Sequence, residues 1–142
     1  MPGVTLEELE GIRWGPPEFE SHVVVTCYRL RSKPVDEFTV EDLRIMIGQN
    51  IGLTHLLPRA VAMLETNPLA EGDCFAGDLL SAVLCAERSV IQNNAELLRR
   101  ISAVAETVQS SLNAGPGPNP RRVEEKLLSE IAQFKAGGHG AC

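Results

Sequence analysis

Apolar side chains recur at intervals of three and four residues along most of this chain, and this spacing favours α-helices. The pattern is clearest between Phe38 and Leu84. Thr39 is followed three residues later by Asp42, a variant of the capping box that begins a helix. The apolar stripe of this helix comprises Leu43, Met46 and Ile47. The core of the protein is therefore expected to consist of helices.

The same spacing predicts helices elsewhere. Asp78 is predicted to cap a strongly apolar helix at the centre of the fold. Residues 22–27 are open to two interpretations, because Val23 to Thr26 favour a strand on propensity. We expect a helix over 18–32, since a lone strand has nothing to pair with. The remaining expected helices cover 6–10, 54–66, 95–112 and 121–136, with a further stretch around 90–91. The predicted fold class is all-α, a compact irregular bundle of about six or seven helices.

The C-terminal part is divided by a Gly- and Pro-rich stretch, AGPGPNP, which has the composition of a linker. The expected organisation is a helical domain over 1–113, a linker over 114–120, an amphipathic helix over 121–136 and a disordered tail over 137–142. The amphipathic helix is expected to pack back on its own domain. The alternative is that its apolar face docks onto a partner, as in a regulatory or scaffolding module.

Negative charge is concentrated in the middle of the chain. The segment from Asp36 to Glu87 contains nine acidic residues and only two basic ones, Arg44 and Arg59, so it carries −7 while the whole chain carries −6. Such a segment repels nucleic acid and anionic lipid and attracts a basic partner. The apolar runs are too short to span a bilayer and the N-terminus lacks an export signal. The expected location is cytoplasmic, with neither nucleic acid nor membrane as a partner.

Catalytic and cofactor signatures are weak. Paired Cys/His spacings for a metal and the Lys-Ser/Thr of a phosphate loop are missing from the sequence, and we expect no cofactor. A small all-α enzyme would have to use the central acids, with Glu41, His55, Asp73 and Asp78 as acid and base. The structural alternative is that these carboxylates serve helix N-termini, and it is favoured. The protein is therefore not expected to be an enzyme.

The middle of the chain also resembles a known family. The segments LRSKP at 30–34, TVEDLR at 39–44, IGQNIGL at 47–53, NPLAEGD at 67–73 and GDLL at 77–80 carry this resemblance. It is to the helical immunity proteins of bacterial contact-dependent growth inhibition systems. The resemblance implies that the protein binds and neutralises the toxic C-terminal domain of a cognate toxin in the cytoplasm.

Charge and resemblance agree on a basic partner. A nuclease-type toxin must be basic where it binds phosphate, and an acidic inhibitor can cover that surface. The predicted toxin-binding residues share a negative charge and lie in the central segment: Asp36, Glu37, Glu41, Asp42, Glu65, Glu71, Asp73 and Asp78.

Overall fold

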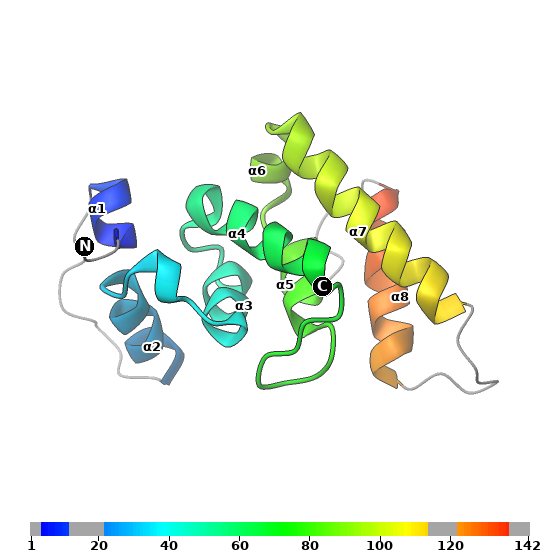
Figure 1. The fold of residues 1–142 in the computed structure, drawn as a ribbon, viewed down its shortest axis with the longest axis horizontal. Helices are drawn as coiled ribbons and strands as arrows, with labels where there is room; N and C mark the ends of the chain where they lie inside the picture. The colour runs from blue at the N-terminus through cyan, green and yellow to red at the C-terminus, as the bar shows by residue number, and fades with distance from the viewer. Residues whose placement is uncertain (1–3, 12–21, 114–121, 137–142) are drawn as a thin grey trace.

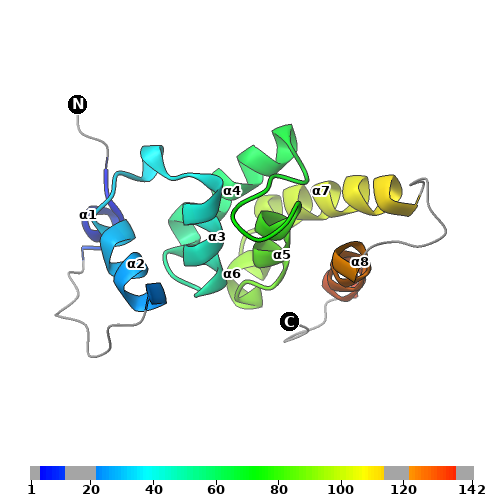
Figure 2. The same cartoon turned by 90° about the horizontal axis from the view of Figure 1, so that it is seen from below.

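The helices follow one another along the long axis of the molecule (Figures 1 and 2). The computed structural model describes residues 4–11, 22–113 and 122–136. One end consists of α1 (Leu6–Glu10) and α2 (His22–Arg31), and the other of α7 (Ala95–Asn113) and α8 (Arg122–Lys135). Between them lie η1 (Val35–Glu37), α3 (Val40–Gly48), α4 (Leu53–Thr66), α5 (Asp78–Leu84) and α6 (Arg88–Gln92). The all-α class is confirmed, because the described ranges contain no β-strand.

Local sequence signals determine several helix starts. The Thr39 hydroxyl accepts a hydrogen bond from the Asp42 amide, and the Asp42 carboxylate accepts one from the Thr39 amide, both at 3.1 Å. This is the predicted capping box. The Asn94 side chain accepts a bond from the Leu97 amide at 3.0 Å and so caps α7. Residues 22–31 are helical, as expected, while 18–21 lie outside the described residues.

The short helix α5 lies at the centre and contacts α3, α4 and α8. Its residues Leu79, Leu80 and Val83 have no exposed surface. A helix buried on all sides must be apolar on all sides, which explains why α5 is short and almost free of charge. The apolar residues of α3 and α4 that pack in this core are Leu43, Met46, Ile47, Leu53, Leu56, Leu57, Ala60, Val61 and Leu64.

The last helix packs on the rest of the fold. α8 contacts α5 and α7, and its apolar side chains Leu127, Ile131 and Phe134 are buried. A carboxylate shares this face, because Glu130 is only 6% exposed and accepts a hydrogen bond from the Ser81 hydroxyl of α5 at 2.8 Å. The predicted linker over 114–120 and tail over 137–142 lie outside the described residues.

The central position of α5 leads to a stability prediction. Leu80→Ala should lower the free energy of unfolding by about 2–5 kcal/mol, because it leaves a cavity in a fully packed site. Leu9→Ala is the matched control, since Leu9 is 42% exposed on α1 and should lose under about 0.5 kcal/mol. Urea denaturation of the two variants provides the comparison. Equal losses would mean that α5 is not the centre of the core.

Candidate functional site

The loop between α4 and α5 is held by the carboxylate of Asp78. This carboxylate accepts hydrogen bonds from the amides of Gly72 at 2.7 Å, Cys74 at 3.0 Å and Phe75 at 3.3 Å. The prediction that Asp78 is the N-cap is wrong. Gly77 is the N-cap with a φ of 91°, and Asp78 is the first residue of α5. From this position the buried carboxylate binds the preceding loop and not its own helix.

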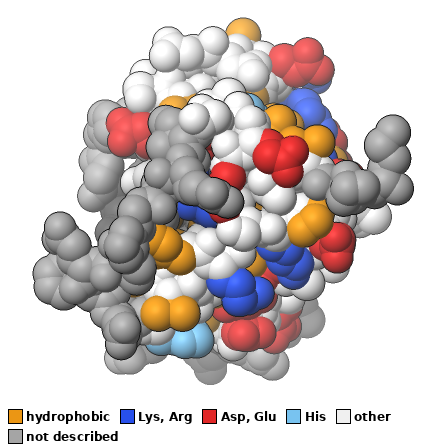
Figure 3. Space-filling view, turned by 90° about the vertical axis from the view of Figure 1, so that its left-hand side faces the viewer, with side chains coloured by type: hydrophobic (Ala, Val, Ile, Leu, Met, Phe, Trp, Pro, Cys, Tyr) orange, Lys and Arg blue, Asp and Glu red, His pale blue; other side chains and the backbone are white. Residues whose placement is uncertain are grey.

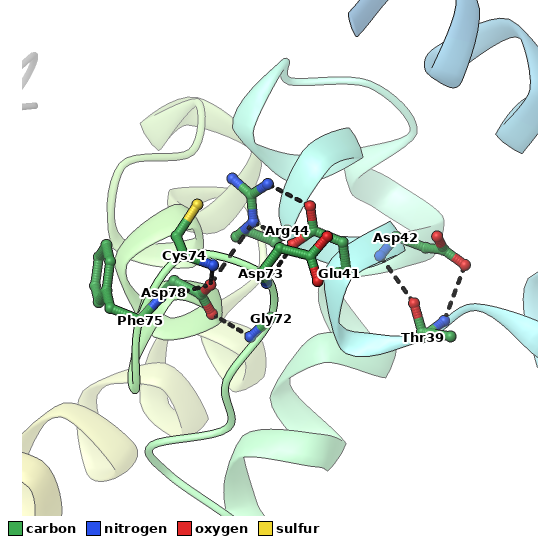
Figure 4. Close-up of polar contacts among 9 residues, drawn as sticks. All are labelled: Thr39, Glu41, Asp42, Arg44, Gly72, Asp73, Cys74, Phe75 and Asp78. Atoms are coloured by element: carbon green, nitrogen blue, oxygen red, sulfur yellow. Dashed lines mark hydrogen bonds and ion pairs between the residues drawn. The ribbon is translucent and has the colours of Figure 1, made fainter. Parts of the chain in front are cut away.

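A second carboxylate holds the same loop from α3 (Figure 4). Glu41 accepts the amide hydrogen of Asp73 at 2.9 Å and binds the guanidinium of Arg44 with both oxygens, at 2.6 and 2.5 Å. Arg44 also lies 3.8 Å from the Asp78 carboxylate, so one cation compensates two anions. The hydrogen bond from Arg44 lowers the pKa of Glu41; burial opposes this, and the bond from the Asp73 amide adds to it. We call this set of contacts the loop clamp: Glu41, Arg44 and Asp78 with the amides of residues 72–75.

Gly72 is required by the closeness of the two carboxylates. A Cβ at this position would lie 2.6 Å from a carboxylate oxygen of Glu41 and 3.1 Å from one of Asp78. Any larger residue would force either the Glu41 carboxylate or the loop to move, and both movements disturb the clamp. An isolated bridge between Glu71 and Ala76 closes the loop from the other side.

Asp42 is also used within the fold. It is 7% exposed, and in addition to the capping box it binds the Lys33 ammonium at 2.6 Å. Burial raises the pKa of Asp42, but the hydrogen bonds from Lys33 and Thr39 together lower it more, so that its pKa lies below the ordinary value.

Two further acids form ion pairs on the surface. Asp36 lies 2.7 Å from Arg59, and Glu65 binds Arg100 at 2.5 and 3.1 Å. Of the eight predicted toxin-binding residues, only Glu37, Glu71 and Asp73 are exposed and make no ion pair with a described residue. Glu37 precedes α3 by three residues and Asp73 binds its first turn through Glu41. We call these three residues the open carboxylates; they flank the N-terminal end of α3.

The structure does not bring His55 to these acids. Glu41 lies in the first turn of α3, whereas His55 follows the opposite end, about 10 Å along the axis for the seven residues from Glu41 to Gly48. His55 lines a separate cavity with Glu10 and Glu87. The predicted acid and base of a small enzyme are therefore not assembled in one cleft.

The described residues contain neither a metal-binding cluster nor a membrane-spanning helix. No group of three or more His, Cys, Asp or Glu side chains in the described part of the chain could hold a metal ion. None of the helices there is long and apolar enough to cross a membrane. The carboxylates of Glu41 and Asp78 accept hydrogen bonds from backbone amides, and Glu41 also binds the Arg44 guanidinium. Their role in this structure is to hold the loop.

Two of the buried charges that were not predicted from the sequence lie at α8 and its contact with α6. Arg88 is 8% exposed, donates a hydrogen bond to the Phe134 carbonyl at 3.0 Å and lies 4.1 Å from the centre of the Phe134 ring. Glu130 is the second. It follows Leu127 by three residues, and this spacing places it on the apolar face of α8. The sequence therefore contained the information needed to predict its burial. Both residues fasten α8 to the central helices.

The loop clamp predicts unequal losses of stability for two isosteric changes in nearby residues. Asp78→Asn should cost about 2–3 kcal/mol, because an amide leaves buried N–H groups without their charged acceptor. Asp73→Asn, which removes an exposed charge, should cost under about 0.5 kcal/mol. Urea denaturation measures both costs. Hydrogen exchange at Gly72, Cys74 and Phe75 should accelerate in the Asp78 variant alone, and unchanged exchange there would contradict the clamp.

The lowered pKa values of Glu41 and Asp42 predict a loss of stability in acid. Their ordinary values are 4.5 and 3.8, and the folded values are lower, so their contribution is complete above about pH 5 and is lost as the pH falls below these values. The free energy of unfolding should therefore fall as the pH drops below about 4.5. Glu41→Gln should show a smaller fall than wild type in denaturation at each pH, and an identical fall would refute the contribution of Glu41.

Comparison with known proteins agrees with the resemblance in the central motifs. The chain matches the family model of CDI immunity proteins over residues 8–101, which include the loop clamp and the open carboxylates. This is more than half of the 142 residues. No curated protein matches the chain. The chain belongs to the family of CDI immunity proteins, where CDI denotes contact-dependent growth inhibition.

Proposed function

We propose that this protein binds a cognate toxin domain in the cytoplasm and neutralises it by covering its active surface. The proposed contact is the surface formed by the open carboxylates Glu37, Glu71 and Asp73. The observation that carries this proposal is the loop clamp, which fixes two exposed acids in one backbone conformation. Family membership supplies the class of partner.

A fixed loop suits tight binding. Ordering a mobile loop on association would cost conformational entropy. A loop that is already ordered in the folded protein loses little more when the partner binds. The carboxylates of Glu41 and Asp78 hold the amides of Gly72, Asp73 and Cys74, while Glu71 and Asp73 stay exposed. The clamp residues thus support the contact surface, and the open carboxylates meet the partner.

Only some of the predicted toxin-binding residues present free negative charge on the surface. Asp42 and Asp78 are buried and already have partners, so they present little charge to another protein. Asp36 and Glu65 are exposed but paired with arginines, which reduces the negative charge that they present to a partner. We assign them to the rim of the proposed interface.

The other end of the molecule is a weaker candidate for electrostatic binding. On the face formed by α1 and α2, acidic and basic side chains are interspersed with apolar ones (Figure 3). The exposed apolar residues Val4, Leu9 and Val25 all belong to this end. A surface of mixed sign does not steer a basic partner, whereas the open carboxylates do.

The proposed toxin is a nuclease with a basic phosphate-binding surface. An inhibitor that occupies this surface excludes the nucleic acid directly, and an interface of about 1,200–2,000 Å² in total is enough for a specific complex. Such inhibition needs no chemistry by the immunity protein. Protection of cells should therefore require at least one immunity protein for each toxin molecule.

Charge reversal of the open carboxylates tests the proposal. Glu71→Lys with Asp73→Lys should lower the association rate constant with the cognate toxin domain by about tenfold or more at 50 mM salt, since opposite charge speeds encounter. At 500 mM salt the difference from wild type should shrink, because screening shortens the range of surface charges. Stopped-flow fluorescence gives the rate constants, and growth of toxin-producing cells gives protection.

The matched control reverses two acids on α7. Glu96→Lys with Glu106→Lys changes the net charge equally at exposed positions whose own ion pairs are loose, at 3.6 Å each. This pair should lower the association rate much less than the loop pair. If both pairs slow association equally, only the total charge matters and the assigned surface is wrong.

A further inference from the structure

A cavity of about 290 Å³ lies at the opposite end of α3 from the open carboxylates. Its walls come from the end of α1, the turn between α3 and α4, the start of α4, and the start of α6. Liquid water takes about 30 Å³ per molecule, so this space is large enough for a side chain. Its described lining residues include neither the loop clamp nor the open carboxylates.

The cavity is built on a turn that the fold holds firmly. Asn50 adopts a left-handed conformation with a φ of 57°, and its side-chain oxygen accepts a hydrogen bond from the Glu87 amide at 2.9 Å. Gly52 has a φ of 64°, and a Cβ there would lie 2.9 Å from a methyl carbon of the buried Leu6. These contacts join α1, α4 and α6 around the cavity. Its shape therefore exists before any partner binds.

The charge of the lining selects a cation. Glu10, Glu87 and His55 line the cavity, and none of its described lining residues is a Lys or Arg. Glu10 is already bonded to the buried guanidinium of Arg31, so the uncompensated charge belongs to Glu87. Glu87 is exposed, and among the described residues its carboxylate accepts only the Ser89 hydroxyl, at 3.2 Å. An anion would be repelled here, and the described residues offer no set of ligands for a metal ion.

Apolar residues complete the lining. Leu53 is buried, Val90 is half-buried, and both line the same cavity as Glu10 and Glu87. A long basic side chain matches this lining, because its methylene stem can pack on apolar surface while its cationic head lies beside a carboxylate. Arginine fits better than lysine, since its planar, weakly hydrated guanidinium bonds carboxylates with two N–H groups.

We propose that this cavity receives an arginine side chain of the toxin domain. This inference rests on the proposed function for the identity of the partner, but the cavity itself can be tested without the toxin. The arginine would place its guanidinium at Glu87 and its stem along Leu53 and Val90. It would form a contact separate from the open carboxylates.

The first test uses the full-length protein and N-acetyl-arginine amide as the probe. Titration followed by amide NMR should show saturable shifts at residues 50–55 and 87–90, with a Kd on the order of millimolar. N-acetyl-citrulline amide has nearly the same shape without the charge and should shift these amides at least about fivefold less at equal concentration. No saturation with arginine, or equal shifts with citrulline, would overturn the proposal.

A substitution then identifies the carboxylate. Glu87→Gln keeps the acceptor for Ser89 and should weaken arginine binding by about fivefold. Glu96→Gln removes an equal charge from α7, outside the cavity, and should leave binding unchanged. Glu10→Gln is avoided, because it would remove a carboxylate that binds the buried Arg31 and would destabilise the fold itself.

The final measurement connects the cavity to the toxin. Calorimetry with the cognate toxin domain should show at least about fivefold weaker binding for Glu87→Gln, with Glu96→Gln equal to wild type. Equal toxin affinity for Glu87→Gln and wild type would overturn the toxin contact while leaving the proposed function intact. Failure of the wild-type protein to bind the toxin would instead overturn both the proposed function and the toxin contact, and the arginine titration would still decide whether the cavity binds a cation.

Discussion

Burial of α5 on all sides is the constraint on which the rest of the structure depends. Its leucines contact α3, α4 and α8, so these helices are positioned by packing against one short apolar segment. The first residue of the same helix is a buried carboxylate. Asp78 can be accommodated there only because three loop amides and a nearby guanidinium satisfy it. The central packing and the conformation of the loop are therefore linked through one helix.

Features that depend on neighbours in the chain could be predicted, and features that depend on distant residues could not. The capping box of Thr39 and Asp42 spans three residues and was predicted correctly. Asp78 was misassigned because an acid before an apolar run looks the same at the N-cap and at the first helical position. The loop that decides between them folds back only in three dimensions. Residues 22–27, in contrast, were predicted correctly as helix. The prediction relied on the lack of a partner strand, and the described elements contain none.

The acidic character of the central segment has a different meaning in three dimensions. A formal charge of −7 suggests one continuous negative face. In the fold, Lys33, Arg44, Arg59 and Arg100 compensate most of these acids, and two of the four bases come from outside the segment. Counting charges along the chain cannot detect such pairing. The open negative charge is consequently small and localised, which favours a defined contact over a general attraction for cations.

The close approach at Gly72 gives the residues of one loop unequal freedom to vary. A side chain at Gly72 would collide with the Glu41 carboxylate and crowd that of Asp78. Glu71 and Asp73, in contrast, are exposed, and the clamp bonds the amide of Asp73, not its side chain. New side chains at these two positions would alter the outer surface with little effect on the core. An immunity lineage could thus follow a diverging toxin by exchanging the residues on either side of a constant glycine. Partner choice and foldability would then evolve almost independently.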